Sequence, residues 1–384
     1  MKVFWATKLR GFFRHLSERN PDVDFIDNAN YYETNSFMSL LKSRLIRSHL
    51  LDPLGVFQVI EVKGKDCDCY GSSNRFLNSD KPYFIYLENP TALYHYTLGR
   101  ISYPAGKKKF NQCLNDKNLR YIVCMSDACR DTFEKINVKV PERLKFRTIY
   151  PFVPDNKNVS KDTISQKSKG EYLECLFCVQ GTHFVSKGGL EVLTAVENLQ
   201  KNGNRIHLTV ITKIDDLDSH ALTRINEIEN VTLHDFDYSY QELEKVYAKT
   251  NVLIQPASIE SFGLTVLEAM KGGCAVIASK LYAFPEMVQD GYNGYLVEPK
   301  FWFFDKNNIP NPKVWEHRKR TIFSLKESQS LIKELEDKIA LLSQDRELLE
   351  RLSLNSFEFA HTKFGEETIS EQWKDVWQTL KQED

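Results

Sequence analysis

Short apolar runs alternate with helical patterns along most of the chain. In its first half, runs rich in β-branched and aromatic residues predict strands, and helical patterns lie between several of them, for example at 36–47 and 127–136. The predicted strands are residues 2–6, 23–27, 56–62, 82–88, 120–126 and 145–150. This alternation is typical of an α/β domain built on a parallel sheet.

A second series of the same kind begins after residue 170. Its predicted strands are residues 174–181, 205–212, 231–236, 251–257, 274–279 and 294–299, and predicted helices begin near residues 188, 240 and 264. Residues 155–170, between the two series, are polar and rich in Lys and Ser, which predicts an interdomain linker. Two doubly wound α/β domains facing a cleft are the simplest solution, with ligands at the carboxyl ends of the strands.

The regular pattern lapses after Pro299. The aromatic residues 301–304 and the cationic residues 317–320 follow, and from about residue 325 the pattern is helical to the end. The aromatic residues either contact a membrane or a partner, or pack beneath a long loop. We therefore divide the chain into an N-terminal domain, a linker, a C-terminal domain and a final helix, at 1–154, 155–170, 171–365 and 366–384.

Length and composition agree with this division. A chain of 384 residues exceeds the size of a single hydrophobic core, and 42% hydrophobic residues exclude a disordered chain. The 51 basic residues balance 52 acidic ones, which argues against nucleic acid as a partner. No apolar run is long enough for a membrane span, and the N-terminus lacks a secretory signal, so we expect a cytoplasmic protein with reduced thiols. Cys175 and Cys178 have redox or zinc-like spacing, but a strand with two buried thiols is the favoured interpretation.

The stretch from 256 to 273 carries the strongest chemical signal. A predicted strand ends before it, a turn of small residues follows, and a helix begins after Gly263. Peptide N–H groups at a helix start are free and favour anions, so backbone amides at Phe262, Gly263 and Leu264 could hold a diphosphate. Glu260 precedes the helix and is placed to meet the group attached to the phosphates. A carboxylate at Glu268, inside the helix, could accept two hydrogen bonds from a ribose diol.

This stretch, PASIESFGLTVLEAMKGG, closely resembles the retaining glycosyltransferases of GT-B fold in family four, whose donor domain carries a Glu-x7-Glu motif. The likeness continues through CAVIAS into VQDGYNGYLVEP. Upstream, FCVQGTHFVSKGG resembles the family's phosphate loop, where Lys187 and Gly188 match and Thr182 replaces the usual Arg. The family commonly has a glycine near the nucleotide base, and this chain has Asp235 at that position. The resemblance covers most of 82–300 and the helical tail.

The resemblance implies a fold and a set of site residues. The fold is GT-B, with two Rossmann-like domains and C-terminal helices that cross back to the first domain. Lys187 would stabilise the leaving phosphates and Glu260 would orient the sugar, which makes these two the catalytic residues. The implied donor-binding residues are Gly181, Thr182, Gly188, Ser261, Phe262, Gly263, Leu264 and Glu268.

The N-terminal half matches the family more loosely. Relatives have a glycine-containing loop that meets the acceptor after the first strand, and many have a His at the position of YLENP. The implied acceptor-side residues are Lys8, Arg10, Gly11, Glu88 and Asn89. A basic site for a phosphate-bearing acceptor, a face approaching anionic lipid and an ordinary solvated helix stay open for the cluster after the first strand.

The implied reaction is a retaining, hexosyltransferase-like transfer from a nucleotide sugar to a glycan, lipid-linked or protein acceptor. A UDP-sugar is the favoured donor, with neither a metal nor another cofactor. The acceptor would belong to surface polysaccharide or glycolipid assembly, with a possible contact at the inner membrane face. Residues 300–324 are an insertion relative to the family.

Three other interpretations stay open. A GT-B enzyme that cleaves or isomerises a nucleotide sugar is one, and a non-catalytic GT-B subunit that binds a partner glycosyltransferase is another. The third is a divalent metal at Asp66 and Asp68, since a D-x-D pattern holds a metal in the other glycosyltransferase fold. Solvated turn residues are the favoured interpretation of that pattern.

Overall fold

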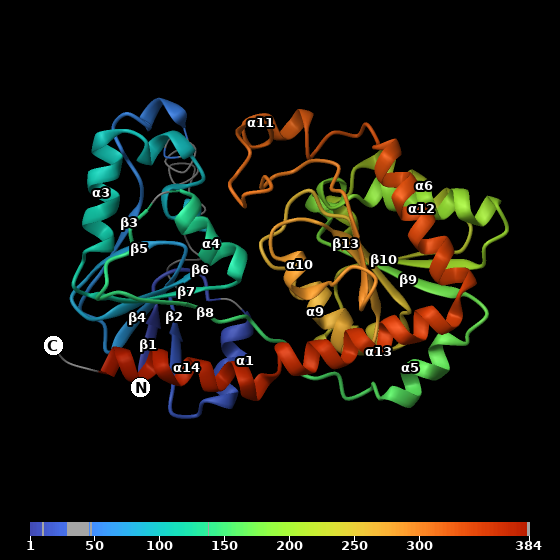
Figure 1. The fold of residues 1–384 in the computed structure, drawn as a ribbon, viewed down its shortest axis with the longest axis horizontal. Helices are drawn as coiled ribbons and strands as arrows, with labels where there is room; N and C mark the ends of the chain where they lie inside the picture. Colours follow the sequence, from blue (N-terminus) through green and yellow to red (C-terminus); the bar gives the residue numbers. More distant parts are fainter. Residues whose placement is uncertain (10, 29–45, 47, 137, 382–384) are drawn as a thin grey trace. The chain divides into compact units, whose positions relative to one another are not determined.

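The computed structural model describes residues 1–9, 11–28, 46, 48–136 and 138–381. They form two compact units (Figure 1). The first unit comprises Met1–Phe152, Asn307–Pro310 and Glu366–Asp384, and the second comprises Val153–Lys306 and Asn311–Gly365. Each unit is built around one six-stranded sheet. The architecture is therefore α/β, with two Rossmann-like units.

The sheet of the first unit is entirely parallel. Its strands, in spatial order, are β2 (Asp24–Asp27), β1 (Lys2–Trp5), β4 (Cys69–Ser73), β6 (Tyr83–Leu87), β7 (Leu119–Cys124) and β8 (Lys145–Thr148). A separate parallel pair consists of β3 (Val59–Val62) and β5 (Phe76–Ser79). The helices of this unit are α1 (Gly11–Arg19), η2 (His49–Leu51), η3 (Pro90–Tyr94), η4 (Leu98–Ile101), α3 (Pro104–Leu114), α4 (Asp127–Lys135) and α14 (Glu366–Lys381).

The last helix supplies part of the first unit's core. Trp373 and Trp377 stack on α14 with ring centroids 5.0 Å apart, and Trp373 is fully buried. The Trp373 ring packs against Phe13 of α1 at 5.6 Å and Phe84 of β6 at 5.8 Å. Figure 1 shows α14, in red, running beside α1. The two Trp residues thus serve a structural role in the first unit.

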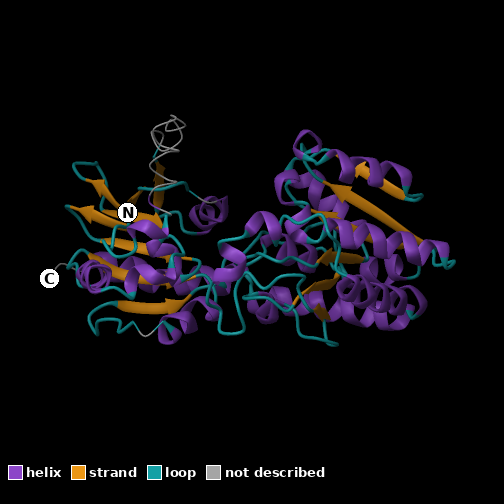
Figure 2. Cartoon of the chain, turned by 90° about the horizontal axis from the view of Figure 1, so that it is seen from above, coloured by secondary structure: helices purple, strands orange, loops and turns teal. Residues whose placement is uncertain are grey.

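The sheet of the second unit is also entirely parallel. Its strands, in spatial order, are β11 (Val231–His234), β10 (Ile206–Ile211), β9 (Leu173–Cys178), β12 (Val252–Gln255), β13 (Ala275–Ser279) and β14 (Gly294–Val297). Its helices are α5 (Lys161–Ser168), η5 (Gly181–His183), η6 (Val185–Lys187), α6 (Gly189–Lys201), η7 (Ile214–Asp216), α7 (Ser219–Glu227), α8 (Tyr240–Lys249), α9 (Leu264–Lys271), α10 (Phe284–Met287), α11 (Pro312–Trp315), η8 (Arg318–Arg320), α12 (Gln329–Gln344) and α13 (Arg346–Lys363). Figure 2 distinguishes these helices, in purple, from the orange strands that they surround.

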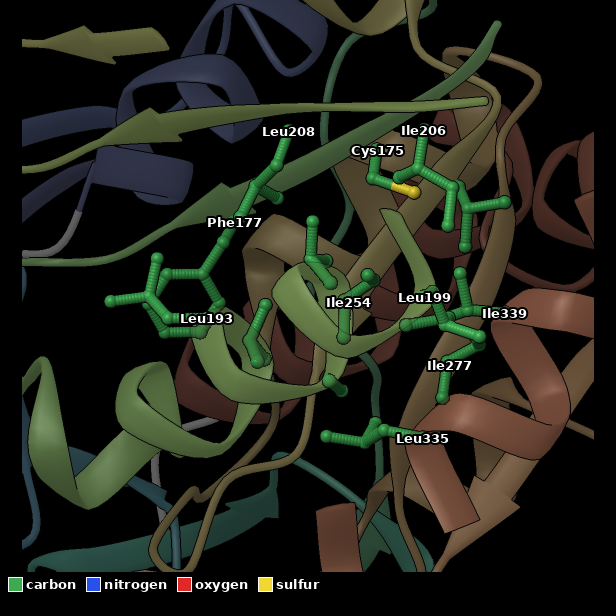
Figure 3. Close-up of a cluster of buried hydrophobic side chains, with 14 of the residues drawn as sticks. Cys175, Phe177, Leu193, Leu199, Ile206, Leu208, Ile254, Ile277, Leu335 and Ile339 are labelled. Carbon is green, nitrogen blue, oxygen red and sulfur yellow. The ribbon is translucent and has the colours of Figure 1, made fainter. Parts of the chain in front are cut away.

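Apolar side chains from several elements interlock in the second unit (Figure 3). Phe177 of β9 and Leu193 of α6 meet here, and α12 contributes Leu335 and Ile339. The spacing of the last two, four residues apart, places them on one face of α12. Burying this face fixes α6 and α12 against the sheet.

The structure differs from the sequence expectation in three places. Strands β4 and β5 were not predicted, because their residues are largely small or polar. The polar stretch 155–170 is not a bare linker, because it contains α5 and belongs to the second unit. A capping box between Ser160 and Thr163 starts this helix, and the buried Ile164 anchors it. The helix expected at 36–47 lies largely outside the described residues.

The aromatic run 301–304 is divided between packing and surface. Phe303 and Phe304 are 2% and 3% exposed, and Phe304 stacks on Tyr282 at 4.3 Å. Phe301 and Trp302 are half-buried. Packing therefore accounts for the second half of the run. Within the described residues, no helix is long and apolar enough to cross a membrane.

Candidate functional site

The order of the second sheet locates a crevice. Successive strands run outward from β9 through β10 to β11, and in the opposite direction from β12 through β13 to β14. β9 and β12 are neighbours, so the order reverses between them. In open parallel sheets, ligands bind at such a switch point, beyond the carboxyl ends of the strands. The two loops that leave these ends are 179–188 and 256–263, the same two stretches that carry the sequence motifs.

These two loops are joined by direct contacts. The backbone N–H of Ser258 donates to the carbonyl oxygen of Ser186 over 2.9 Å. Gly188 has a φ of +83°, and a Cβ atom there would lie 2.8 Å from the Pro256 carbonyl oxygen. Only glycine combines that conformation with so close an approach. The 179–188 and 256–263 loops therefore pack directly against each other.

Lys187 and Glu260 meet where the loops join. The Lys187 ammonium lies 2.9 Å from Oε2 of Glu260 and also donates to the carbonyl oxygen of Ile259. The two side chains are 14% and 22% exposed. Burial raises the pKa of Glu260, but the Lys187 charge and N–H groups at Ser261 and Phe262 outweigh it, so the pKa is lowered overall. The pair is thus a lysinium and a carboxylate, partly open to solvent.

Two of the predicted residues shape the start of α9. Gly263 has a φ of +95°, and a Cβ atom there would lie 2.4 Å from the Phe284 ring, so the position requires glycine. Leu264 begins the helix and is 37% exposed. The first amides of an α-helix have no carbonyl partner within it, and the helix dipole is positive there. The start of α9, four residues after Glu260, therefore favours an anion.

Ser261 and Phe262 direct backbone N–H groups at the Glu260 carboxyl. The Ser261 backbone N–H donates to Oε1 of Glu260 over 2.9 Å, and the Phe262 N–H also lowers the pKa of this carboxyl. The Phe262 ring is buried against Phe364 at 6.0 Å. These amides orient Glu260 in the structure.

Glu268 lies one turn into α9, and the pKa of its carboxyl is raised. Burial raises the pKa of its carboxyl to about 7, although the Tyr247 hydroxyl, which donates to Oε2 over 2.9 Å, lowers it. Tyr247 of α8 is only 2% exposed. Because the pKa lies near neutrality, the carboxyl exists in both forms at physiological pH. Tyr247 belongs to the site by contact, and no motif in the sequence identifies it.

The remaining residues of the first loop vary in exposure. Gly181 is buried, and a Cβ atom there would lie 2.3 Å from the Lys213 carbonyl oxygen. Thr182 is exposed at the position where the family usually has Arg. His183 has a lowered pKa, because of burial and then the Lys187 charge. Asp235, in place of the family's glycine, accepts from the backbone N–H of Ile214 over 3.1 Å.

The acceptor-side residues follow strands of the first sheet. Lys8 and Gly11 are exposed after β1, and Arg10 lies outside the described residues. Glu88 is half-buried after β6, and its N–H donates to the Asn74 side chain over 2.9 Å. Asn89 is fully buried, accepts from the Thr91 N–H over 2.9 Å and caps η3. The structure therefore gives Asn89 a capping role and leaves it out of contact with solvent.

The D-x-D pattern and the Cys175–Cys178 spacing, which could suggest metal sites, both have structural explanations. Lys2 bonds both carboxylates of the D-x-D pattern, through its ammonium to Asp66 at 2.8 Å and its backbone N–H to Asp68 at 2.7 Å. Cys175 and Cys178 are buried along β9. Across the part of the chain that the structure describes, no group of three or more His, Cys, Asp or Glu side chains is arranged to hold a metal.

Comparison with known proteins agrees with this geometry. Residues 161–302 match the family described as glycosyl transferases group 1. A sucrose synthase from Melioribacter roseus is 28% identical over 152 residues, which are 38% of this chain and 18% of that protein. An uncharacterized 41.2 kDa protein in the cps region of Klebsiella pneumoniae is 36% identical over 83 residues, which are 22% of each chain. The chain thus matches about a fifth of the length of these curated relatives.

A solved structure supports the fold over the whole length. The Anabaena protein HepE, crystallised in complex with UDP-glucose, aligns with 99% of this chain and all of its own, with a TM-score of 0.59 and 14% identity. At that identity the likeness establishes the fold alone. The fold and the matched motifs together identify the chain as a protein of GT-B fold, similar to the glycosyltransferases of family four and matching the glycosyl transferases group 1 model over residues 161–302.

Proposed function

We propose that this protein transfers a sugar from a nucleoside-diphosphate sugar to an acceptor hydroxyl, with retention of anomeric configuration. The observation that carries the proposal is the Lys187–Glu260 pair, held at the switch point beside the start of α9. A cation, a helix N-terminus and two carboxylates within one crevice fit a diphosphate that bears a sugar and a ribose.

Charge explains how the residues would act. In the proposed step, the bond between the anomeric carbon and the diphosphate oxygen breaks, and the bond to the acceptor oxygen forms. The acceptor's proton moves to the departing diphosphate, so no protein base is required. The Lys187 ammonium has three N–H donors, and two are directed to the Ile259 carbonyl and to Glu260. The third would bind a phosphate oxygen and stabilise the charge that develops as the diphosphate leaves.

The two carboxylates would have separate tasks. Glu260, ionised and fixed by the Ser261 N–H, would orient the sugar ring. Glu268 would accept hydrogen bonds from the ribose hydroxyls in its ionised form. With Lys187 and the α9 amides at the phosphates, the proposed chemistry does not depend on a metal. A UDP-sugar is the proposed donor, supported by the likeness to a protein crystallised with UDP-glucose.

The proposed acceptor belongs to surface polysaccharide or glycolipid assembly. This proposal is supported by the likeness to the Klebsiella protein in the cps region. Exposed lysines of the first unit, Lys8, Lys107 and Lys108, are compatible with a contact at an anionic membrane surface.

Binding and turnover test the proposal separately. In thermal unfolding with UDP-, GDP-, ADP-, dTDP- and CMP-sugars, we expect the unfolding temperature to rise with the sugars of one nucleotide. A ligand at about 100 times its dissociation constant stabilises by about 2.7 kcal/mol. Lys187→Ala should then lower the release of nucleoside diphosphate about 100-fold or more, as loss of a transition-state charge contact does. Unchanged turnover in both Lys187→Ala and Glu260→Gln would refute the site assignment.

A second candidate function is a non-catalytic GT-B subunit that binds a partner glycosyltransferase. The exposed Thr182 favours it, because the family's usual second cation for the diphosphate is missing there. This candidate predicts no thermal shift with any nucleotide sugar. Binding without turnover, with a shift that Glu268→Ala abolishes, would also favour it.

A further inference from the structure

The beginning of the insertion returns to the 256–263 loop. The Phe301 N–H donates to the Ser258 hydroxyl, and the Phe303 N–H donates to the Ser258 carbonyl oxygen, both over 3.2 Å. Ser258 is 2% exposed and stands two residues before Glu260. Its own N–H donates to Ser186, the residue before Lys187. Ser258, which belongs to the 256–263 loop, therefore bonds both the insertion and the 179–188 loop.

A buried ion pair fixes the two ends of the insertion. The Lys300 ammonium lies 2.8 Å from Oε1 of Glu191, and these side chains are 5% and 0% exposed. The same ammonium donates to the Ser324 carbonyl oxygen over 2.9 Å, and the Ser328 N–H donates to Glu191 over 3.1 Å. Glu191 belongs to the first turn of α6, three residues after Gly188. The insertion is thereby tied to the helix that follows the Lys187 loop.

Aromatic packing completes the attachment. Phe304 stacks on Tyr282, with ring planes 24° apart, and Phe303 packs against Trp315 at 5.4 Å. Tyr282 lies in the loop after β13, two residues before Phe284, whose ring contacts Gly263. Residues 300–304 therefore touch the loops after β12 and β13 as well as α6.

We propose that Ser258 and Lys300 are positioning residues, through which residues 300–304 hold Lys187 and Glu260 in the geometry that the donor requires. This inference rests on the proposed function. Neither residue has to contact the donor. An error of about 1 Å in the placement of a catalytic group can cost about 100-fold in rate, so a brace two residues from Glu260 has leverage on turnover. The bond from the Phe301 N–H to the Ser258 hydroxyl is the part of the brace that a substitution can remove while the backbone bonds of Ser258 remain.

Ser258→Ala tests the inference, with Ser168→Ala as a matched control. Each serine is buried and makes one side-chain hydrogen bond, but the Ser168 hydroxyl bonds Ile164 within α5, away from the site. Loss of one neutral hydrogen bond corresponds to about 3- to 10-fold in an equilibrium. We expect Ser258→Ala to lower kcat for nucleoside diphosphate release by at least that factor while KM for the donor changes less. Ser168→Ala should lower Tm without changing kcat.

Amide hydrogen exchange without ligand supplies a readout that does not depend on activity. Ser258→Ala should speed exchange of amides in 256–263 and 301–303 about 3- to 10-fold, while Ser168→Ala should leave them unchanged. Glu191→Gln, which keeps the shape of the ion pair but removes one charge, should speed exchange in the same segments. Unchanged exchange at 256–263 in both variants would overturn the inference whether or not the wild type turns over a sugar donor. An inactive wild type that still shows the exchange effect would instead refute the proposed function and leave the brace supported.

Discussion

The half-buried carboxyl of Glu268 makes the stability of the second unit depend on pH. Its pKa is raised from 4.5 to about 7 in the folded protein, chiefly by burial. In the unfolded chain the same carboxyl is exposed and has its ordinary pKa. The folded state therefore binds the proton more tightly. The stabilisation is complete below pH 4.5, where both states are protonated, and it is lost as the pH rises through about 7.

The magnitude follows from the two pKa values. At about 1.36 kcal/mol per pH unit, the difference between 4.5 and about 7 corresponds to about 3 kcal/mol. Glu268→Gln removes the titration but keeps an oxygen that can accept the Tyr247 hydroxyl bond. Relative to wild type, the variant should therefore gain about 3 kcal/mol in free energy of unfolding between pH 4.5 and pH 8.

Denaturant unfolding of both proteins without nucleotide, at pH 4.5, 6, 7 and 8, measures this difference. Groups that titrate equally in the two proteins cancel when one curve is subtracted from the other. A difference that stays constant across this range would refute the reasoning, because it would mean that the pKa of Glu268 is not raised by folding. At pH 8 the variant should be more stable and bind the donor more weakly, since the ionised carboxyl is the form proposed to bind ribose.

Three further predictions concern neighbouring features. Tyr247→Phe removes the hydroxyl bond that lowers the Glu268 pKa. The pH at which the stability stops falling, about 7 in the wild type, should therefore move higher, and an unchanged upper limit would contradict that contact. Gly263→Ala introduces a Cβ 2.4 Å from the Phe284 ring at a positive φ and should destabilise the protein by about 1–3 kcal/mol, measured by thermal unfolding. Trp373→Ala should cost about 3–5 kcal/mol in the first unit alone, and calorimetry should show one of two transitions shifting; a shift of both would contradict separate unfolding of the units.

Many of the strands and the core of the site follow from local signals. Strands β12 and β13 are largely apolar and fully buried, as expected for parallel strands covered on both faces. The glycines at 188 and 263 mark positions where backbone approaches backbone or a ring, and they lie beside Lys187 and Glu260. The family resemblance placed these residues in one site because their motif is local and densely spaced.

Other features depend on contacts between distant residues. Tyr247 meets Glu268 across two elements, and nothing around the tyrosine in the sequence distinguishes it from a core residue. Strand β4 has few bulky residues because Trp5 fills the space over Gly71, where a Cβ would lie 2.5 Å from the indole. The bond from Phe301 to Ser258 spans 43 residues and uses backbone N–H groups, which carry no signal in the sequence.

The placement of α14 in the first unit has a consequence for the order of folding on the ribosome. Domains generally fold as units while the chain is being synthesised, N-terminal first. Here Trp373 packs in a core with Phe84, which is made 289 residues earlier, and Phe13, which is made 360 residues earlier. The core of the first unit therefore stays incomplete until Trp373 has been synthesised. The second unit, whose sheet is contiguous in sequence, can complete its core first. The order of synthesis therefore allows the second unit to complete its core before the first.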